Sequence, residues 1–381
     1  MNRLRKLRAG PYRRALPDDA ETALLRLVHA ERLDAEACRQ WLDRADLDNA
    51  HDGIWRLMPL LHKRMIDAGI DHGESGRLTG LYRHTRFRNR ILLHRGEKLV
   101  RALEQLGIPA LLLKGASLVL HPGVDIGTRP MADFDLLLPE DTDLDALLLR
   151  LAPLLDFTLE TRIRGTVSYT YADNSGLEYD LHSHLRPKTQ FAGSTRPYWQ
   201  HSRPLQLGET DTKGLCAEHF VFHSMLHGLE HNAVSPLRWV SDVLFALEID
   251  PLFDWDRLFS HAQRNCALEV ILVATSYLVD KGFRVPGVQP HFEHWSRVRE
   301  SWWIARYHRY RSAPFDNGRA SIAMRFMAYF VLLSRLRGKP ASPVNFVRFV
   351  QDHYGSASGM GSLVRLVWRG LFAGQPQSRE P

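Results

Sequence analysis

The pattern of hydrophobic and polar positions changes character near residues 107 and 215. From residue 18 to about residue 106, apolar residues recur at three- and four-residue spacing, which predicts helices. The longest amphipathic stretch covers residues 82–106 and stops at Gly107-Ile-Pro109, which is typical of a helix end. Residues 1–106 are therefore predicted to form an N-terminal helical region.

The segments between residues 107 and 186 are shorter and follow another pattern. Residues 110–113 and 134–138 are apolar runs next to turn residues, which predicts buried strands. Three later segments alternate between polar and apolar residues and predict a meander, at 157–162, 166–172 and 177–185. With short helices expected at 116–120 and 144–155, the fold class is α+β: a small mixed β-sheet core flanked by helices.

The rest of the chain is predicted to be a connection followed by a second helical region. Residues 187–214 are polar and lack periodicity, which favours a linker or an active-site loop. Residues 215–381 return to helical spacing. No apolar run reaches the ~20 residues that span a bilayer, and the basic N-terminus lacks the apolar stretch of a secretory signal. We therefore expect a cytoplasmic protein without a transmembrane segment.

Charge and cysteine content narrow the range of partners and sites. The net charge of +7 favours anionic partners such as nucleotides, nucleic acid or an acidic membrane surface, although a solvated basic surface would explain the same charge. The three cysteines, Cys38, Cys216 and Cys266, are too few and too scattered for a disulfide framework or a cysteine zinc site. We expect them to be reduced and mostly buried.

Two aspartates one residue apart are the strongest candidates for chemistry. Asp133 and Asp135 lie on a predicted strand, where alternate side chains share a face. Two close carboxylates repel each other, but they suit a divalent metal. Asp180, on the strand predicted at 177–185, can join them if the two strands are neighbours. An isolated Asp-x-Asp is usually a loop or a cap, so the argument depends on the order of these acids after the turn at Gly115.

These motifs resemble the nucleotidyltransferase superfamily typified by DNA polymerase beta, and more closely an uncharacterised bacterial nucleotidyltransferase family. The resemblance covers about residues 20–290. Its central motifs are Leu113-Lys-Gly-Ala-Ser-Leu118, Arg129, Asp133-Phe-Asp-Leu-Leu137 and Asp180-Leu-His182. The helical segments Arg88-Asn-Arg90, Leu237-Arg-Trp-Val-Ser-Asp242 and Phe253-Asp-Trp-Asp256 also resemble that family. The wider superfamily usually carries Gly-Gly or Gly-Ser at the turn, where this chain has Gly115-Ala116-Ser117.

The resemblance implies a metal-dependent nucleotidyltransferase that moves a nucleoside monophosphate from an NTP to a hydroxyl or phosphate acceptor, with release of pyrophosphate. Mg²⁺ is the implied ion, with Mn²⁺ as the alternative. Asp133 and Asp135 would bind the metal ions that hold the triphosphate. Asp180 would complete the metal site and lower the pKa of the acceptor hydroxyl.

The same resemblance implies a nucleotide-binding turn. Gly115 would let the backbone approach a phosphate, and the amides of Ala116 and Ser117 would begin a helix whose N-terminus favours anions. Lys114 points either at phosphate or away from it. Arg129 either neutralises a phosphate or tethers its loop to the sheet.

Histidines and the C-terminal segment leave several interpretations open. His182 is a base, a partner of a metal ligand or, most simply, a packed side chain. Histidines recur every fourth residue at His219, His223, His227 and His231, which places a stripe along a helix. The stripe packs on the sheet, binds phosphate or base, or holds zinc. The aromatic and basic residues after 290 pack, stack on nucleic acid or lie at a membrane surface.

Two other functions fit the sequence. One is a catalytically inactive regulatory module that binds nucleotide or RNA, which the basic ends of the chain suggest. The other is an enzyme that attaches a nucleotide to a protein or tRNA partner, as some members of the superfamily do. The acceptor and the preferred base are not encoded in any motif that the sequence shows.

Overall fold

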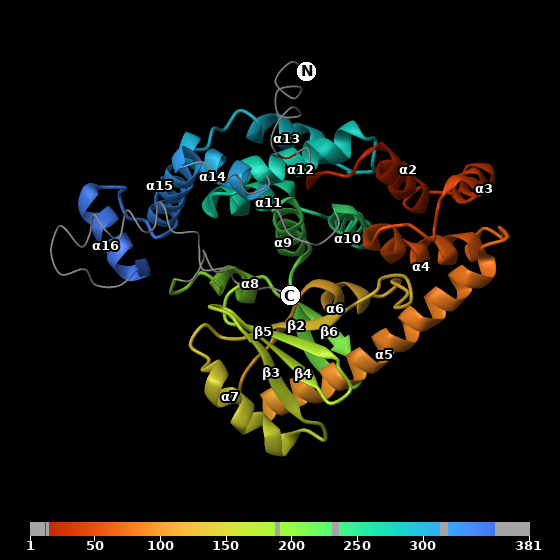
Figure 1. The fold of residues 1–381 in the computed structure, drawn as a ribbon, viewed down its shortest axis with the longest axis horizontal. Helices are drawn as coiled ribbons and strands as arrows, with labels where there is room; N and C mark the ends of the chain where they lie inside the picture. The colour runs from red at the N-terminus through yellow and green to blue at the C-terminus, as the bar shows by residue number, and fades with distance from the viewer. Residues whose placement is uncertain (1–11, 13–14, 187–190, 231–235, 313–318, 355–381) are drawn as a thin grey trace.

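The computed structural model describes residue 12 and residues 15–186, 191–230, 236–312 and 319–354. Its N-terminal part is helical, as predicted, with α2 (Asp19–Val28), α3 (Ala35–Arg44), α4 (Asp52–Asp67) and α5 (Ser75–Gln105). Helix α5 ends where expected: Gly107 has a φ of +71°, and the Ile108 amide donates to the Leu103 carbonyl. In Figure 1, α5 runs diagonally from the end of α4 at the right of the view down to the sheet.

A seven-stranded mixed sheet forms the centre of the molecule, which confirms the predicted α+β class. Its strands lie in the order β3-β4-β5-β2-β1-β7-β6, with β2–β5 and β1–β7 parallel and the other pairs antiparallel. The strands are β1 (Leu111–Leu112), β2 (Asp133–Leu137), β3 (Leu159–Arg164), β4 (Ser168–Asp173), β5 (Glu178–His182), β6 (Arg203–Leu207) and β7 (Thr210–Gly214). Helix α6 (Lys114–Val119) follows β1, and α7 (Leu144–Leu151) with a 3₁₀ turn (Ala152–Leu154) follows β2.

The prediction of a linker or loop at residues 187–214 is partly wrong, because part of this segment forms a helix and two strands. After the short helix α8 (Arg196–Gln200), strands β6 and β7 form a hairpin that extends the sheet beyond β1. The Glu97 side chain of α5 holds this hairpin, because its Oε1 accepts from the Glu209 amide at 2.9 Å and from the Thr210 hydroxyl at 3.1 Å. The strands are short and largely polar, so they acquire their structure from α5 and β1 rather than from a local pattern. Residues 187–190 of the segment lie outside the described residues.

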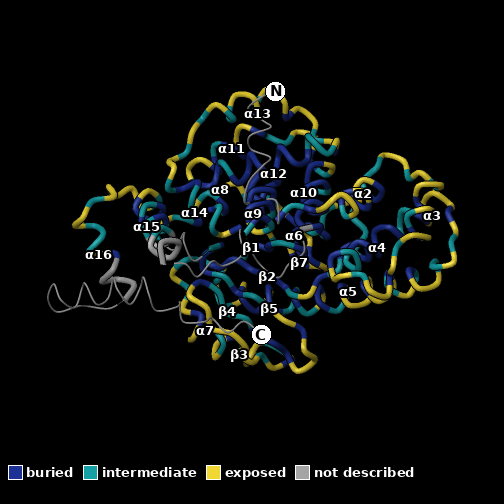
Figure 2. Tube along the Cα trace, turned by 45° about the horizontal axis from the view of Figure 1, so that its top comes forward, coloured by how far each residue is buried: buried dark blue, intermediate teal, exposed yellow. Residues whose placement is uncertain are grey.

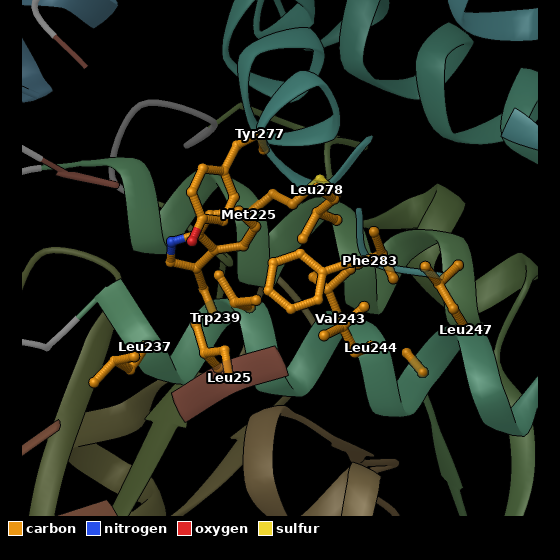
Figure 3. Close-up of a cluster of buried hydrophobic side chains, with 14 of the residues drawn as sticks. Leu25, Met225, Leu237, Trp239, Val243, Leu244, Leu247, Tyr277, Leu278 and Phe283 are labelled. Atoms are coloured by element: carbon orange, nitrogen blue, oxygen red, sulfur yellow. The ribbon is translucent and has the colours of Figure 1, made fainter. Parts of the chain in front are cut away.

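The C-terminal part is helical, as predicted. Its helices are α9 (Ala217–Leu229), α10 (Pro236–Ile249), α11 (Trp255–Arg264), α12 (Leu268–Asp280), α13 (Val288–Trp295), α14 (Trp302–Ser312), α15 (Arg319–Leu336) and α16 (Pro343–Tyr354). Helix α10 packs against α9 and also against α2 and α4 of the N-terminal part. Figure 3 shows the shared core, in which Leu25 of α2 lies among Met225, Trp239 and Tyr277. The two helical regions therefore form one layer over the sheet.

The two faces of strand β2 have different neighbours. Phe134 and Leu136 face a core that includes Leu99 and Leu103 of α5. Gly96 of α5 lies so close to the Phe134 ring that a β-carbon there would collide with it. The alternate positions of β2, which carry the two aspartates, face the helical layer. Figure 2 shows the buried residues gathered in the centre of the molecule, where β1, β2 and α9 meet.

Cys38, Cys216 and Cys266 are buried free thiols, which confirms the expectation for them. Among the described residues, no helix is both long enough and apolar enough to cross a bilayer.

Candidate active site

The parallel pairing of β2 with β5 brings the acids together. Asp135 lies directly opposite Asp180, while Asp133 lies opposite Glu178. The two strands are neighbours, as the sequence argument required. The third acid meets Asp135, however, whereas Asp133 lies one step further along the same face.

Asp135 is the buried centre of this group, with 1% of its surface exposed. Its Oδ1 accepts from Lys114 Nζ at 2.5 Å and lies 3.2 Å from His182 Nε2. Burial opposes ionisation, but the Lys114 ammonium and the His182 ring outweigh it and hold the pKa of Asp135 well below its usual range. Asp135 is therefore a carboxylate at neutral pH.

The pKa of Asp180 is shifted in the opposite direction to that of Asp135. Its Oδ1 accepts from the Thr170 hydroxyl at 2.6 Å. Burial, and then the negative charge of Asp135, raise the pKa of Asp180 above its usual value. A cation between the two carboxylates would relieve this repulsion.

Three side chains of this group can hold a metal ion. Asp135, Asp180 and His182 each offer one ligand atom, and these atoms lie within 4.8 Å of one another. Two carboxylates and an imidazole suit a divalent cation. Asp133, a predicted ligand, does not belong to this trio; its carboxylate is 24% exposed and lies 4.0 Å from Lys114 Nζ. His182, for which packing was the simplest expectation, instead contacts Asp135.

Lys114 points into the acids, which resolves the orientation that the sequence left open. It begins α6 with a φ of +44°, in the left-handed region that residues other than glycine rarely adopt. Burial opposes its charge, but Asp135 and Asp133 raise the pKa of Lys114 above the usual value. Lys114 is therefore an ammonium that balances the carboxylates.

Arg129 is a tether in this structure, one of the two roles considered for it. Its side chain is 7% exposed and makes a bidentate ion pair with Asp242 of α10, with Nε–Oδ1 at 2.7 Å and Nη2–Oδ2 at 2.8 Å. The pair joins the loop before β2 to the helical layer. The Arg129 side chain also leaves room only for glycine at position 115. A β-carbon there would collide with Arg129 Nη1 and would lie 2.8 Å from Met131 Cγ.

We therefore expect Gly115→Ala to destabilise the protein by about 1–3 kcal/mol, as overpacking of a buried site does. The matched control is Gly80→Ala in α5, where an added methyl meets no atom within 4 Å. That change should be neutral or stabilise by up to about 1 kcal/mol, because alanine favours a helix. Urea unfolding measures both, and equal midpoints for the two variants would contradict the tight fit at Gly115.

The other two residues of the predicted turn do not join the acids. Ala116 is buried in the core beneath the sheet. Ser117 contacts β7, since a β-carbon on Gly214 would lie 2.5 Å from Ser117 Oγ. Strand β7 lies on the side of β1 opposite to β2. The Ser117 hydroxyl therefore lies beside the hairpin.

The histidine stripe of α9 divides into two parts. His219 packs among rings, with centroids 4.9 Å from Tyr198 and 4.3 Å from His261. His223 lies over the acid group: burial, His227 and Lys114 hold the pKa of His223 well below its usual value. Its Nε2 is buried without a hydrogen-bond partner in the described structure. His231 lies outside the described residues.

The comparisons with known proteins identify a family for this chain. Residues 54–284, more than half of the 381 residues, match the family described as uncharacterised nucleotidyltransferase. The chain belongs to this family, which confirms the family-level resemblance seen in the sequence.

Matches to individual proteins are sparse. A search of curated proteins finds no match. Among solved structures, an antigenic nucleotidyltransferase-like protein from Paracoccidioides brasiliensis is similar at 17% identity and a TM-score of 0.35. The match covers 55% of this chain and 92% of that chain. A likeness this distant does not bear on the site.

Proposed function

We propose that this protein is a metal-dependent nucleotidyltransferase of the DNA polymerase beta-like superfamily. It transfers a nucleoside monophosphate from an NTP to a hydroxyl or phosphate acceptor and releases pyrophosphate. The observation that carries the proposal is the pairing of Asp135 with Asp180 across two parallel strands, with Asp133 on the same face. Membership of the nucleotidyltransferase family supports it.

The carboxylates of this group fit a divalent cation, with Mg²⁺ first and Mn²⁺ as the alternative, because both ions favour oxygen ligands. Asp135, Asp180 and His182 would hold it, with Asp133 beside them as a further carboxylate. A divalent ion there would neutralise phosphate charge and lower the pKa of an acceptor hydroxyl.

The residues of the chain position the reactants. Lys114 orients Asp135 and supplies positive charge where a phosphate would enter. His223, with a buried and unpartnered ring nitrogen, covers the site from α9. In the transfer, the acceptor oxygen bonds to the α-phosphorus, the α–β bridging bond breaks, and pyrophosphate and the acceptor proton are released.

The test is transfer from labelled NTPs, with Mg²⁺ or Mn²⁺, to small molecules, tRNA and protein fractions. We expect transfer by the wild type and a loss of about 100-fold or more in Asp133→Asn, because positioning and electrostatics dominate this chemistry. Asp211→Asn, at an exposed position of β7, is the matched control and should keep full activity.

The outcomes separate the functions considered. Failure of the wild type to bind any NTP with any divalent ion would contradict the proposal. Binding without transfer would identify an inactive nucleotide-binding module. Mass spectrometry that finds added nucleotide on a protein or tRNA would identify the acceptor as a macromolecule.

A further inference from the structure

Beside the acids lies a group of arginines that the proposed chemistry has not yet used. Arg238 of α10 precedes Asp242 by four residues, so both side chains lie on one face of the helix. That face meets Arg129, through the ion pair with Asp242. Arg238 is partly buried, and its charge interacts with those of Arg129, Asp242, Asp133 and Arg56. Arg56 comes from α4, which packs against α10.

The positive charge of this group exceeds what the protein neutralises. Both oxygens of Asp242 are engaged by Arg129. Within the described ranges, neither Arg56 nor Arg238 makes an ion pair or hydrogen bond, and Arg129 Nη1 is also buried without a partner. Burial, and then the charge of Arg129, lower the pKa of Arg238. Such an arrangement costs stability unless an anion joins it.

The group has a definite place relative to the acids. Asp133 belongs to both surroundings, because its charge acts on Arg238 and its carboxylate lies 4.0 Å from Lys114 Nζ. A ligand here would meet guanidinium groups on the side of the helical layer and carboxylates on the side of the sheet. Guanidinium groups bind phosphate oxygens through paired hydrogen bonds, and carboxylates bind phosphates through a shared cation. A triphosphate with its bound cation can make both interactions, since its oxygens accept from guanidinium groups and its cation binds carboxylates.

We propose that Arg238 and Arg56 bind the phosphates of the nucleoside triphosphate, so that α10 and α4 grip the substrate opposite the carboxylates of β2 and β5. The inference rests on the proposed function and names the part of the site that recognises its substrate. The partly buried position of Arg238 favours a compact triphosphate over an extended nucleic-acid backbone. Asp242 lies one turn away on the same helix, and its pair with Arg129 ties this part of α10 to the loop before β2.

Calorimetric titration of the full chain with Mg·ATP, inorganic tripolyphosphate and adenosine tests the inference. Arg238→Ala should weaken Mg·ATP and tripolyphosphate by about 10–100-fold, the value of a charge-assisted hydrogen bond, and leave adenosine unchanged. Arg56→Ala should weaken the same two ligands, and Arg238→Lys should retain part of the affinity. Arg297→Ala, at an exposed position after α13, is the matched control and should bind as the wild type does.

Thermal melting without ligand separates a binding role from a structural one. Removing an unpaired, partly buried cation should leave the melting temperature of Arg238→Ala unchanged or raise it. A lower melting temperature with unchanged tripolyphosphate affinity would overturn the inference in favour of a structural role. If Arg238→Ala does not fold, the affinities of Arg238→Lys and Arg56→Ala decide the question.

The remaining outcomes distinguish this inference from the proposed function. Transfer by the wild type, with unchanged Mg·ATP affinity in Arg238→Ala, would overturn the inference and leave the function intact. Arg238-dependent binding of tripolyphosphate by a protein that transfers nothing would support the inference and contradict the function. Arg238-dependent binding of an RNA oligonucleotide, with no binding of ATP or tripolyphosphate, would overturn the triphosphate assignment.

Discussion

Asp135→Asn is expected to abolish nucleotidyl transfer and to destabilise the protein by about 3–5 kcal/mol, the cost of removing one partner from a buried ion pair. The Asp135 carboxylate is 1% exposed and the Lys114 side chain 19% exposed. The variant leaves the Lys114 ammonium enclosed without its close counter-charge, and it removes the acid that faces Asp180. Urea unfolding measures the stability, and the labelled-NTP assay measures transfer.

Asp133→Asn is the matched control for this prediction. Its carboxylate is 24% exposed and 4.0 Å from Lys114 Nζ, so its loss should cost only about 1 kcal/mol or less while transfer is still lost. Adding Lys114→Met to Asp135→Asn should recover part of the stability, because the two side chains act as a pair. Equal unfolding midpoints for the two aspartate variants would contradict the burial argument.

The same pair predicts a pH dependence. The pKa of Asp135 is lowered in the folded protein, so its contribution is fully present above the unfolded value of about 3.9. That contribution is lost as the pH falls toward the lowered folded pKa. The stability difference between wild type and Asp135→Asn should therefore be constant from pH 7 to about pH 5 and should shrink at lower pH.

Asp242→Asn is expected to destabilise the protein by about 3–5 kcal/mol for a related reason. Its partner Arg129 is 7% exposed and would remain buried, with Arg238 adding a second uncompensated charge nearby. The pair also joins the loop before β2 to α10, so its loss should loosen the contact between sheet and helical layer. Urea unfolding measures the change in free energy.

An exposed ion pair provides the control for Asp242. Glu31 and Arg284 are 3.0 Å apart but 83% and 77% exposed, so Glu31→Gln should change stability by less than about 1 kcal/mol. Replacing both buried partners, as Arg129→Met with Asp242→Leu, should be less damaging than either loss alone. A midpoint for Asp242→Asn that matches Glu31→Gln would show that the buried pair does not hold the layers together.

Local pattern was enough to predict much of this architecture. Helical spacing before residue 106 and after residue 215 predicted the helical regions, and period-two alternation placed Asp133 and Asp135 on one face. Both inferences work because the side-chain period of a helix or strand depends only on neighbours in the chain. The hairpin at 203–214 was missed, since its strands are short and polar and depend on Glu97 of α5.

Site residues divide in the same way. Asp135 and Asp180 were found because Asp-x-Asp and the later acid are visible along the chain. The contact of His182 with Asp135 and the unpartnered ring nitrogen of His223 were not predicted, since an isolated histidine carries no local signal of what lies opposite. The resemblance implied that the amides of Ala116 and Ser117 begin an anion-binding helix, but only the structure shows that the Ser117 side chain lies beside Gly214 of β7.

The sequence by itself determined the α+β class, the family and the acids that share a strand face, because each follows from spacing or from an ordered motif. The tertiary structure alone decided that Asp135, rather than Asp133, meets Asp180, that Lys114 points at the acids, and that Arg129 pairs with Asp242. The register between strands, and the packing of α10 over the sheet, arise from contacts between residues far apart in the chain, and no local period records such contacts.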